Sequence, residues 1–204
     1  MLEQELRTSR VLPVVTATDV ASTVDLARAL QRGGMQAIEI TLRTPAALEA
    51  IVEVQQQVPE IAVAAGTVNT PADLERVVAA GVKLALSPGA TPALLAAAAA
   101  APLDFIPGVA SSSEIMQAQE HGFSIFKLFP AATLGGVAML KALGGPFPDV
   151  RFCPTGGLNP DNFRQFLALP NVVCCGGSWM VSAELVDNGR WNEIETLARE
   201  AMTQ

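Results

Sequence analysis

Eight short apolar stretches, rich in β-branched residues, recur along the whole chain and alternate with segments of helical periodicity. The stretches cover residues 11–16, 37–43, 61–67, 84–89, 104–109, 125–131, 151–157 and 172–178. In the segments between them, apolar residues recur at helical spacing, as at Leu48, Ile51 and Val52. Strands that alternate with helices in units of roughly 20–25 residues are typical of a parallel sheet whose connections are helices.

The starts of the expected helices carry their own signals. A side chain that can cap a helix, followed by proline at the first helical position, is a strong N-terminal signature. The sequence has four such pairs, at 44–45, 70–71, 91–92 and 159–160. In addition, Ser111 and Glu114 have the spacing of a capping box. Five of the expected helices therefore have a predicted first residue.

Eight strand–helix units with short loops predict an α/β fold, a single-domain (β/α)8 TIM barrel over residues 11–204. Residues 1–10 are polar and mixed, and we expect a short helix or tail there. The alternative is an open doubly wound sheet. Its dinucleotide-binding form is disfavoured because no Gly-x-Gly-x-x-Gly pattern follows the first strand.

Charge and composition limit the classes of partner that the protein can bind. The net charge of −7 argues against nucleic acid or an anionic membrane surface as a partner. The longest apolar run, residues 94–101, is too short to span a bilayer. The three cysteines, Cys153, Cys174 and Cys175, and the lack of a recognisable secretory leader favour a reducing cytoplasm. With one histidine, His121, and no Cys-x-x-Cys pair, we expect no metal site.

Lys127 lies within the apolar stretch 125–131. A strand covered on both faces should be apolar almost throughout, and an ammonium there is costly unless it is paired or loses its proton. A deprotonated lysine is a nucleophile. The alternative is a lysine whose stem is buried and whose head reaches solvent at the strand end. Lys83 and Lys141, by contrast, are expected to be solvated.

Strand alternation places Glu39, Thr41 and Arg43 on one face of the stretch 37–43 and apolar residues on the other. The apolar face should meet the helices, so the polar face should point into the barrel. If Lys127 points the same way, Glu39 and Lys127 meet in one small interior space. The alternative is a structural ion pair between Glu39 and Arg43.

Further polar and glycine residues follow the ends of the predicted strands. They are Thr67, Ser87-Pro88-Gly89, Thr155-Gly156-Gly157 and Gly176-Gly177-Ser178. Active sites of such barrels lie at the C-terminal ends of the strands, and the loops after strands seven and eight often bind phosphate. Glycine turns expose backbone N–H groups to an anion, although they can also be tight turns and nothing more.

Taken together, these motifs resemble the class I, Schiff-base aldolases of the KDPG/KHG family, where KDPG is 2-keto-3-deoxy-6-phosphogluconate and KHG is 4-hydroxy-2-oxoglutarate. The resemblance runs from about Val11 to the end. Its carriers are GGMQAIEITLRT at 33–44, AGT at 65–67, SPG at 87–89, IPG at 106–108, FKLFPA at 126–131, RFCPTGG at 151–157 and GGSW at 176–179.

The resemblance implies a role for each matching residue. Lys127 would form the Schiff base and Glu39 would be the general acid/base. The implied substrate contacts are Arg43 and Thr67 for the pyruvate carboxylate, Pro88 and Phe129 for the pocket walls, Thr155 for the substrate hydroxyls, and Gly156, Gly157, Gly177 and Ser178 for the phosphate. The family implies a homotrimer and no cofactor.

The activity implied is reversible cleavage of KDPG to pyruvate and glyceraldehyde 3-phosphate, of the Entner-Doudoroff type. The nearest alternatives are 4-hydroxy-2-oxoglutarate aldolase and phosphogalactonate aldolase. More distant alternatives are a phosphate-binding barrel isomerase or epimerase and a non-catalytic sugar-phosphate binding protein. Two positions depart from many relatives, which have Phe in place of Leu128 and Glu in place of Ala132. Leu128 should face the helices, so the first departure concerns packing. The second alters the loop after the Lys127 strand and bears on substrate preference more than on the chemistry.

Overall fold

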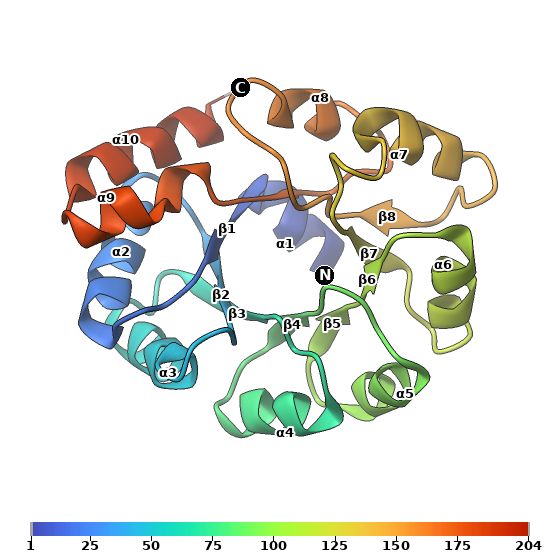
Figure 1. The fold of residues 1–204 in the computed structure, drawn as a ribbon, viewed down its shortest axis with the longest axis horizontal. Helices are drawn as coiled ribbons and strands as arrows, with labels where there is room; N and C mark the ends of the chain where they lie inside the picture. The colour runs from blue at the N-terminus through green and yellow to red at the C-terminus, as the bar shows by residue number, and fades with distance from the viewer. Residues whose placement is uncertain (1, 204) are drawn as a thin grey trace.

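The computed structural model describes residues 2–203 and shows a ring of helices around a curled sheet of short strands (Figure 1). The strands are β1 (Val11–Val15), β2 (Ala37–Thr41), β3 (Ala62–Gly66), β4 (Leu84–Leu86), β5 (Asp104–Ile106), β6 (Gly108–Val109), β7 (Ile125–Leu128), β8 (Arg151–Phe152) and β9 (Cys175–Gly177). The helices are α1 (Leu2–Ser9), α2 (Val20–Arg32), α3 (Ala47–Gln57), α4 (Pro71–Ala79), α5 (Pro92–Ala100), α6 (Ser112–Gln119), α7 (Gly136–Gly144), α8 (Phe163–Leu167), the 3₁₀ helix η1 (Trp179–Val181), α9 (Ala183–Asp187) and α10 (Trp191–Met202).

The strands pair in parallel and form two hydrogen-bonded sheets. The larger has the order β5-β4-β3-β2-β1-β9 and the smaller the order β6-β7-β8. The first strand therefore lies between the second and the last, which is not the order of the doubly wound alternative. Single bridges, Phe152 to Val172 and Thr155 to Gly176, connect β8 to the segment that contains β9. The fold is thus α/β with a curled parallel sheet.

Each predicted strand contains an observed strand, but every one is shorter than predicted. The stretch 104–109, predicted as one strand, is two, because Pro107 between β5 and β6 has no N–H to donate to the ladder. In the stretch 151–157 the regular strand ends at Phe152, shortly before Pro154. Most of the residues lost lie at the C-terminal ends, where the chain leaves the sheet and enters loops.

The helix starts follow the sequence signals in three cases out of five. Thr70 forms a reciprocal capping box with Asp73, and Thr91 and Ser111 each accept the N–H of the residue three positions on. Glu114 reaches back to the N–H of Ala110, at 2.6 Å, one residue further than a capping box predicts.

The predictions at 44–45 and 159–160 were wrong, because α3 begins at Ala47 and α8 at Phe163. The Thr44 hydroxyl instead donates to the carbonyl of Ala17, in the loop after β1. The Asn159 side chain accepts the N–H of Asp161 at 3.0 Å and so closes a local turn before α8. In both places a side chain with capping chemistry is used by a loop, not by a helix.

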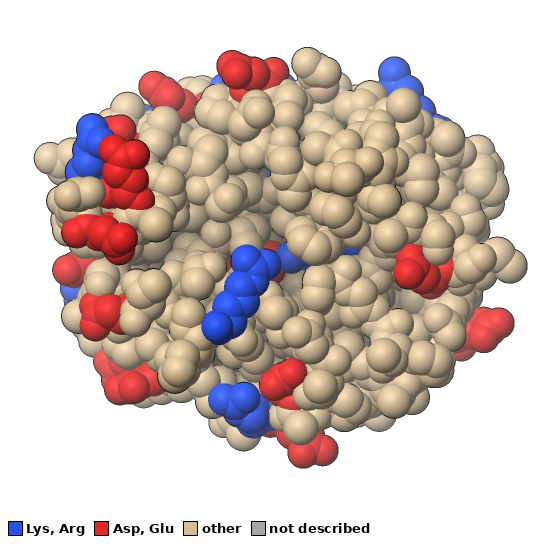
Figure 2. Space-filling view, in the orientation of Figure 1, with Lys and Arg blue, Asp and Glu red and all other residues tan. Residues whose placement is uncertain are grey.

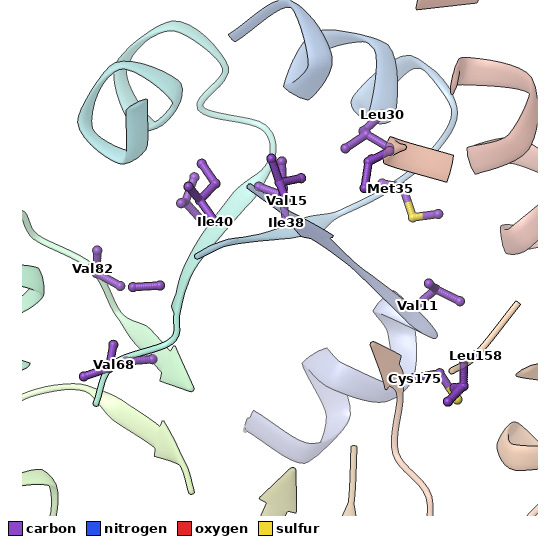
Figure 3. Packing of buried hydrophobic residues seen from close by; sticks show 14 of the residues in the cluster. Val11, Val15, Leu30, Met35, Ile38, Ile40, Val68, Val82, Leu158 and Cys175 are labelled. Carbon is purple, nitrogen blue, oxygen red and sulfur yellow. The ribbon is translucent and has the colours of Figure 1, made fainter. Parts of the chain in front are cut away.

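Two apolar clusters fill the molecule. The larger lies between the strands and the helices, where Val15 and Ile38 lie next to Leu30 of α2, and Ile40 lies on their other side (Figure 3). The smaller lies inside the curl of the sheet and contains Leu6, Leu12, Ala64, Leu86, Ile106, Cys153, Val173 and Cys174. Because Leu6 belongs to α1, the N-terminal helix closes the interior at the end where the strands begin. The C-terminal ends of the strands are left for a site.

Among residues 2–203, no helix combines the length and the apolar character needed to cross a membrane.

Candidate active site

A cavity of about 660 Å³ opens at the C-terminal ends of β1, β7, β8 and β9. Lys and Arg atoms lie at the centre of this face, with a few acidic atoms beneath them, and the other acidic side chains visible on this face lie toward the edge of the molecule (Figure 2). The polar and glycine residues of the wall are Thr16, Thr18, Arg43, Lys127, Thr155, Gly156, Gly157, Gly176, Gly177, Ser178, Ser182 and Asp187. The cavity has the location that the parallel fold predicts for a functional site.

Lys127 and Glu39 form a buried ion pair beside this cavity. The Lys127 Nζ lies 2.7 Å from the Glu39 Oε1, and the two residues are 4% and 0% exposed. Alternation explains their direction, because the neighbours of Lys127 on β7, Phe126 and Leu128, pack in the outer apolar layer. The structure therefore brings the predicted pair together in the interior. A buried pair of this kind is weak evidence for stability, and its place beside a cavity is a stronger indication of function.

The two carboxylate oxygens of Glu39 differ. Oε1 accepts the Lys127 ammonium, whereas Oε2 is buried and has no hydrogen-bond partner among residues 2–203. A buried polar atom without a partner is unusual in a folded protein. It leaves one oxygen able to accept a proton or a hydrogen bond from a ligand.

Arg43 differs from its prediction. It follows the end of β2, is exposed, and lines the cavity wall without entering the interior beside Glu39. Its Nε donates to Thr67 Oγ1 at 3.3 Å. The alternative of a structural Glu39–Arg43 pair is wrong, because the ion pair of Glu39 is with Lys127. The guanidinium is left at the cavity, with its Nε held by Thr67.

Thr67 lies directly after β3 and has a φ of 58°. This left-handed conformation is uncommon for a residue other than glycine and is strained for a β-branched one. Thr67 is not among the residues that line the cavity, but its hydroxyl contacts Arg43, which does.

The two residues predicted as hydrophobic walls occupy different places. Phe129 lines the cavity, and its ring centroid lies 5.9 Å from the Lys127 Nζ, within cation–π range. Pro88 does not line the cavity. Its backbone packs so closely against Gly108 that no side chain would fit at position 108.

The predicted phosphate turns lie together at the end of the cavity formed by β8 and β9. Gly156 and Gly157 have φ values of 99° and 78°, a backbone conformation that favours glycine. Hydrogen bonds hold this turn from outside, since the carbonyl of Gly156 accepts from the N–H of Ala132 and that of Gly157 from Asn162 Nδ2. Ala132, a departure from many relatives, thus supports the turn through its backbone.

The second turn is fixed by an aromatic side chain. A Cβ added at Gly177 would lie 2.8 Å from Cη2 of Trp179 and closer still to other atoms of its ring. The indole ring packs against Phe163, with centroids 5.2 Å apart. Ser178 is exposed at the cavity wall next to this turn, and Thr155 lies buried between the two turns. The two turns therefore form one wall of the cavity.

Sequence reasoning missed Thr16, Thr18, Ser182 and Asp187, which also line the cavity. The two threonines follow β1, and the other two residues belong to the region of α9. Their position after a strand end was the available signal for the threonines. No sequence motif pointed to any of the four as a site residue.

The remaining reactive side chains lie as predicted. Cys153 and Cys174 are buried in the inner apolar cluster, with their Sγ atoms 2.9 Å apart, and all three cysteines are free. The neighbouring Cys153 thiol and burial raise the pKa of Cys174, and burial raises the pKa of Cys175. Such thiols are unreactive. Lys83 and Lys141 are exposed.

Among residues 2–203, no three His, Cys, Asp or Glu side chains come together in a group that could hold a metal ion.

A buried amine in contact with a carboxylate, open to a cavity at the C-terminal ends of parallel strands, defines an α/β enzyme equipped for imine chemistry on a carbonyl compound. The family model of KDPG and KHG aldolases matches residues 2–197, and the chain belongs to this family. It is a lyase family, in agreement with the resemblance found in the sequence motifs.

Individual relatives match over nearly their whole length. The chain is 47% identical to 2-dehydro-3-deoxy-phosphogluconate aldolase of Pseudomonas aeruginosa, with 96% of this chain and 89% of the relative covered. It is 46% identical to the KHG/KDPG aldolase of Escherichia coli, with 98% and 94% covered.

A solved structure matches equally well. It is the KDPG aldolase of Legionella pneumophila with pyruvate captured at low pH as a covalent carbinolamine intermediate. The TM-score is 0.95 and the identity is 44%, with 98% of this chain and 97% of that chain covered.

Proposed function

We propose that this chain is an aldolase that reversibly cleaves KDPG to pyruvate and glyceraldehyde 3-phosphate through an imine on Lys127. The observation that carries the proposal is the buried contact of 2.7 Å between the Lys127 amine and the Glu39 carboxylate. The relatives named as KDPG aldolases, and the carbinolamine captured in the Legionella enzyme, support the same chemistry.

The first step needs a neutral amine. Glu39 Oε1 accepts a proton from the Lys127 ammonium, and the free electron pair of Nζ attacks the C2 ketone to give a carbinolamine. Glu39 then returns the proton to the carbinolamine hydroxyl, which leaves as water. This step forms a protonated imine, whose positive charge makes C2 an electron sink, and restores the Glu39 carboxylate. Arg43 binds the C1 carboxylate while its Nε stays on Thr67.

Cleavage follows from the imine. Glu39 removes the proton of the C4 hydroxyl, the C4–O bond becomes a carbonyl, and the C3–C4 electron pair moves to C2 to form an enamine. Glyceraldehyde 3-phosphate leaves. The enamine then takes a proton at C3 from Glu39, and water adds to the imine to release pyruvate and free Lys127. In this scheme Thr155 contacts substrate hydroxyls, and the turns at 156–157 and 177–178 bind the phosphate.

4-Hydroxy-2-oxoglutarate is a second substrate to consider, because the E. coli relative bears the name KHG/KDPG aldolase. It would use the same lysine and carboxylate and would leave the phosphate turns without a partner. We therefore expect it to be the poorer substrate.

The test is trapping with borohydride. Pyruvate plus borohydride should inactivate the protein and add one reduced pyruvyl group, which peptide mapping finds on Lys127. Lys127→Arg should abolish both labelling and cleavage, since a guanidinium stays protonated. Labelling of the exposed Lys83 or Lys141, or of no lysine, contradicts the proposal. Treatment with EDTA should leave the native activity intact, and strong inhibition would indicate a metal-dependent reaction instead.

The proposal extends to architecture. We infer that the two parallel sheets are parts of one (β/α)8 barrel that starts at Val11, with α1 as an appended helix that closes the end where the strands begin. The bridges between β8 and the β9 segment support this reading. By resemblance to the family we also propose a homotrimer in the cytoplasm. Light scattering on the purified protein tests the trimer, and a monomer would refute it.

A further inference from the structure

Gly66, at the end of β3, occupies the space into which Glu39 leans. A Cβ added at Gly66 would lie 2.7 Å from Cγ and 2.8 Å from Cδ of Glu39, and closer still to Oε1. Those three Glu39 atoms are the nearest neighbours such a Cβ would have. The backbone of Gly66 is outside the left-handed region, so its conformation alone does not require glycine. Position 66 requires glycine because a side chain there would overlap with Glu39.

The strand register shows what this space does. Glu39 is paired with Ala64, and Gly66 is paired with Thr41, two residues further along the strands. Residues two apart on a strand face the same side and are separated by ~6.6 Å. The Glu39 carboxylate therefore leans from its own level toward the level of Gly66, in the direction of the strand ends where the cavity opens. Its Oε1 meets the Lys127 Nζ in that position.

We propose that Gly66 is a positioning residue for the acid/base Glu39, because only a residue without a side chain lets the carboxylate reach Lys127. This inference rests on the proposed function. Gly66 does not itself touch the reacting atoms and acts through Glu39. With alanine at position 66, overpacking forces Glu39 into another rotamer and breaks its contact with the amine.

A second glycine shows the same relation on the other side of the interior. A Cβ at Gly176 would lie 2.8 Å from Cγ2 and 3.0 Å from Cβ of Thr155, with Oγ1 still closer. Gly176→Ala is therefore a matched comparison, since it adds the same methyl group inside the sheet and displaces a different side chain. It should impair cleavage of KDPG more than it impairs reactions of pyruvate alone.

The measurement is exchange of the pyruvate methyl protons with D2O, followed by NMR. Exchange needs the Lys127 imine and a base that moves a proton between C3 and solvent, and it needs no phosphate. We expect Gly66→Ala to slow exchange by about 10²-fold or more, the range for losing a positioned acid/base. Gly176→Ala should slow exchange far less than Gly66→Ala, because the side chain that it displaces is Thr155 and not Glu39. Gly145→Ala, whose Cβ would meet only the Ala142 carbonyl at 3.8 Å, is the remote control.

A double-mutant cycle separates positioning from a general structural role. In a Glu39→Ala background there is no carboxylate to displace, so adding Gly66→Ala should change the residual exchange rate by less than about threefold. The melting temperature should fall on Gly66→Ala in the native chain and stay unchanged in the Glu39→Ala chain. The proposal is wrong if Gly66→Ala lowers the exchange rate and the melting temperature equally in the native and the Glu39→Ala chains. It is also wrong if Gly66→Ala alone exchanges at the native rate.

Two further outcomes are decisive. If Gly66→Ala alone fails to fold, the Glu39→Ala/Gly66→Ala protein decides: a folded double variant supports the proposal, and an unfolded one overturns it. If the native protein neither exchanges pyruvate protons nor takes a borohydride label, the proposed function fails. The melting-temperature cycle then still tests whether Gly66 makes room for Glu39.

Discussion

Glu39 holds its two carboxylate oxygens in different surroundings, and this difference divides its work. Oε1 faces the Lys127 amine at 2.7 Å, while Oε2 is buried without a partner. One oxygen can therefore take the proton that makes Lys127 a nucleophile, and the other is still able to accept a hydrogen bond or a proton. A carboxylate needed only for a structural pair has no reason to keep one buried oxygen unsatisfied, because that is costly.

Replacing the carboxylate by an amide tests this division. Glu39→Gln keeps the size of the side chain and a donor–acceptor contact but cannot accept a proton. We expect the turnover of KDPG to fall roughly 10²–10⁴-fold with the fold retained. Steady-state kinetics and circular dichroism check the two parts. Normal turnover of the variant would reduce Glu39 to a structural partner of Lys127.

Thr67 shows strain at the single-residue scale. Its φ of 58° places a β-branched side chain in the left-handed region, and its hydroxyl contacts Arg43. Relief of such strain is worth about 1–2 kcal/mol, against about 0.5–1 kcal/mol for the extra freedom of an unfolded glycine. Thr67→Gly should therefore raise the unfolding free energy slightly, by up to ~1 kcal/mol.

The same substitution should impair function. Arg43 loses the hydrogen bond that holds its Nε, and loss of a bond to a charged group corresponds to roughly 10–100-fold in kcat/KM. Thr67→Ser keeps the hydroxyl and should stay near native activity. Urea unfolding and steady-state kinetics on both variants check whether Thr67→Gly gains stability while it loses activity. A Thr67→Gly protein that is less stable than the native one would show that the conformation is not strained.

At the scale of elements, α1 is the part whose role the sequence left undecided between helix and tail. In the structure its Leu6 is 4% exposed and packs in the inner cluster with Leu12, Leu86 and Ile106. The helix lies where the strands begin, at the opposite end from the cavity. Substitutions in α1 should therefore lower the stability of the protein without lowering its activity.

Leu6→Ala is the variant that tests the separation. Removing a buried leucine side chain costs about 2–5 kcal/mol of unfolding free energy. Turnover at 25 °C should remain near native as long as the protein is folded. Leu2→Ala, at a half-buried position of the same helix, should cost less. Chemical unfolding with parallel activity assays measures both effects. A large loss of activity in folded Leu6→Ala would mean that α1 influences the site.

The strands and helices were predictable where local chemistry decides them. Alternation along 37–43 predicted the correct interior face for Glu39, because apolar residues mark the other face. The stretch 125–131 is apolar on both faces, so the sequence left the direction of Lys127 open. Local chemistry failed where a side chain has a distant partner. Thr44 had every mark of a helix cap, yet its hydroxyl binds Ala17 across the chain. A single sequence offers no signal for such a contact.

At the scale of the whole molecule, the site is assembled from strand ends that the sheet order brings together. The sequence indicated that residues after strand ends would gather at one face, and the two glycine turns do lie beside one cavity. It could not indicate how deep each side chain reaches. Pro88 misses the cavity, Arg43 lies on its wall, and Thr16 of the loop after β1 joins it, since these depend on loop paths.

The layout of the cavity predicts that its two ends do different work. In the reaction that we propose, Lys127 and Glu39 act on the pyruvate half, and the turns at 156–157 and 177–178 bind the phosphate. The non-phosphorylated sugar acid should therefore be a much poorer substrate by kcat/KM, since the binding energy of the phosphate also orients C4. A side chain at Gly157 is a poor probe, because its Cβ would lie 2.5 Å from that of Ala132 and distort the turn itself.

Ser178 is the better probe, because it is exposed at the cavity wall that we propose for the phosphate, outside the interior. Ser178→Asp places a negative charge next to the bound phosphate. Two like charges about 4 Å apart repel each other by about 1 kcal/mol in water and by about 4 kcal/mol near a protein surface. We expect kcat/KM for KDPG to fall roughly 10–100-fold or more, while pyruvate proton exchange stays native. Ser178→Ala, with no added charge, should lose far less. If Ser178→Asp lowers KDPG cleavage and pyruvate exchange equally, the phosphate binds elsewhere. The proposal for Lys127 then still stands on its own test.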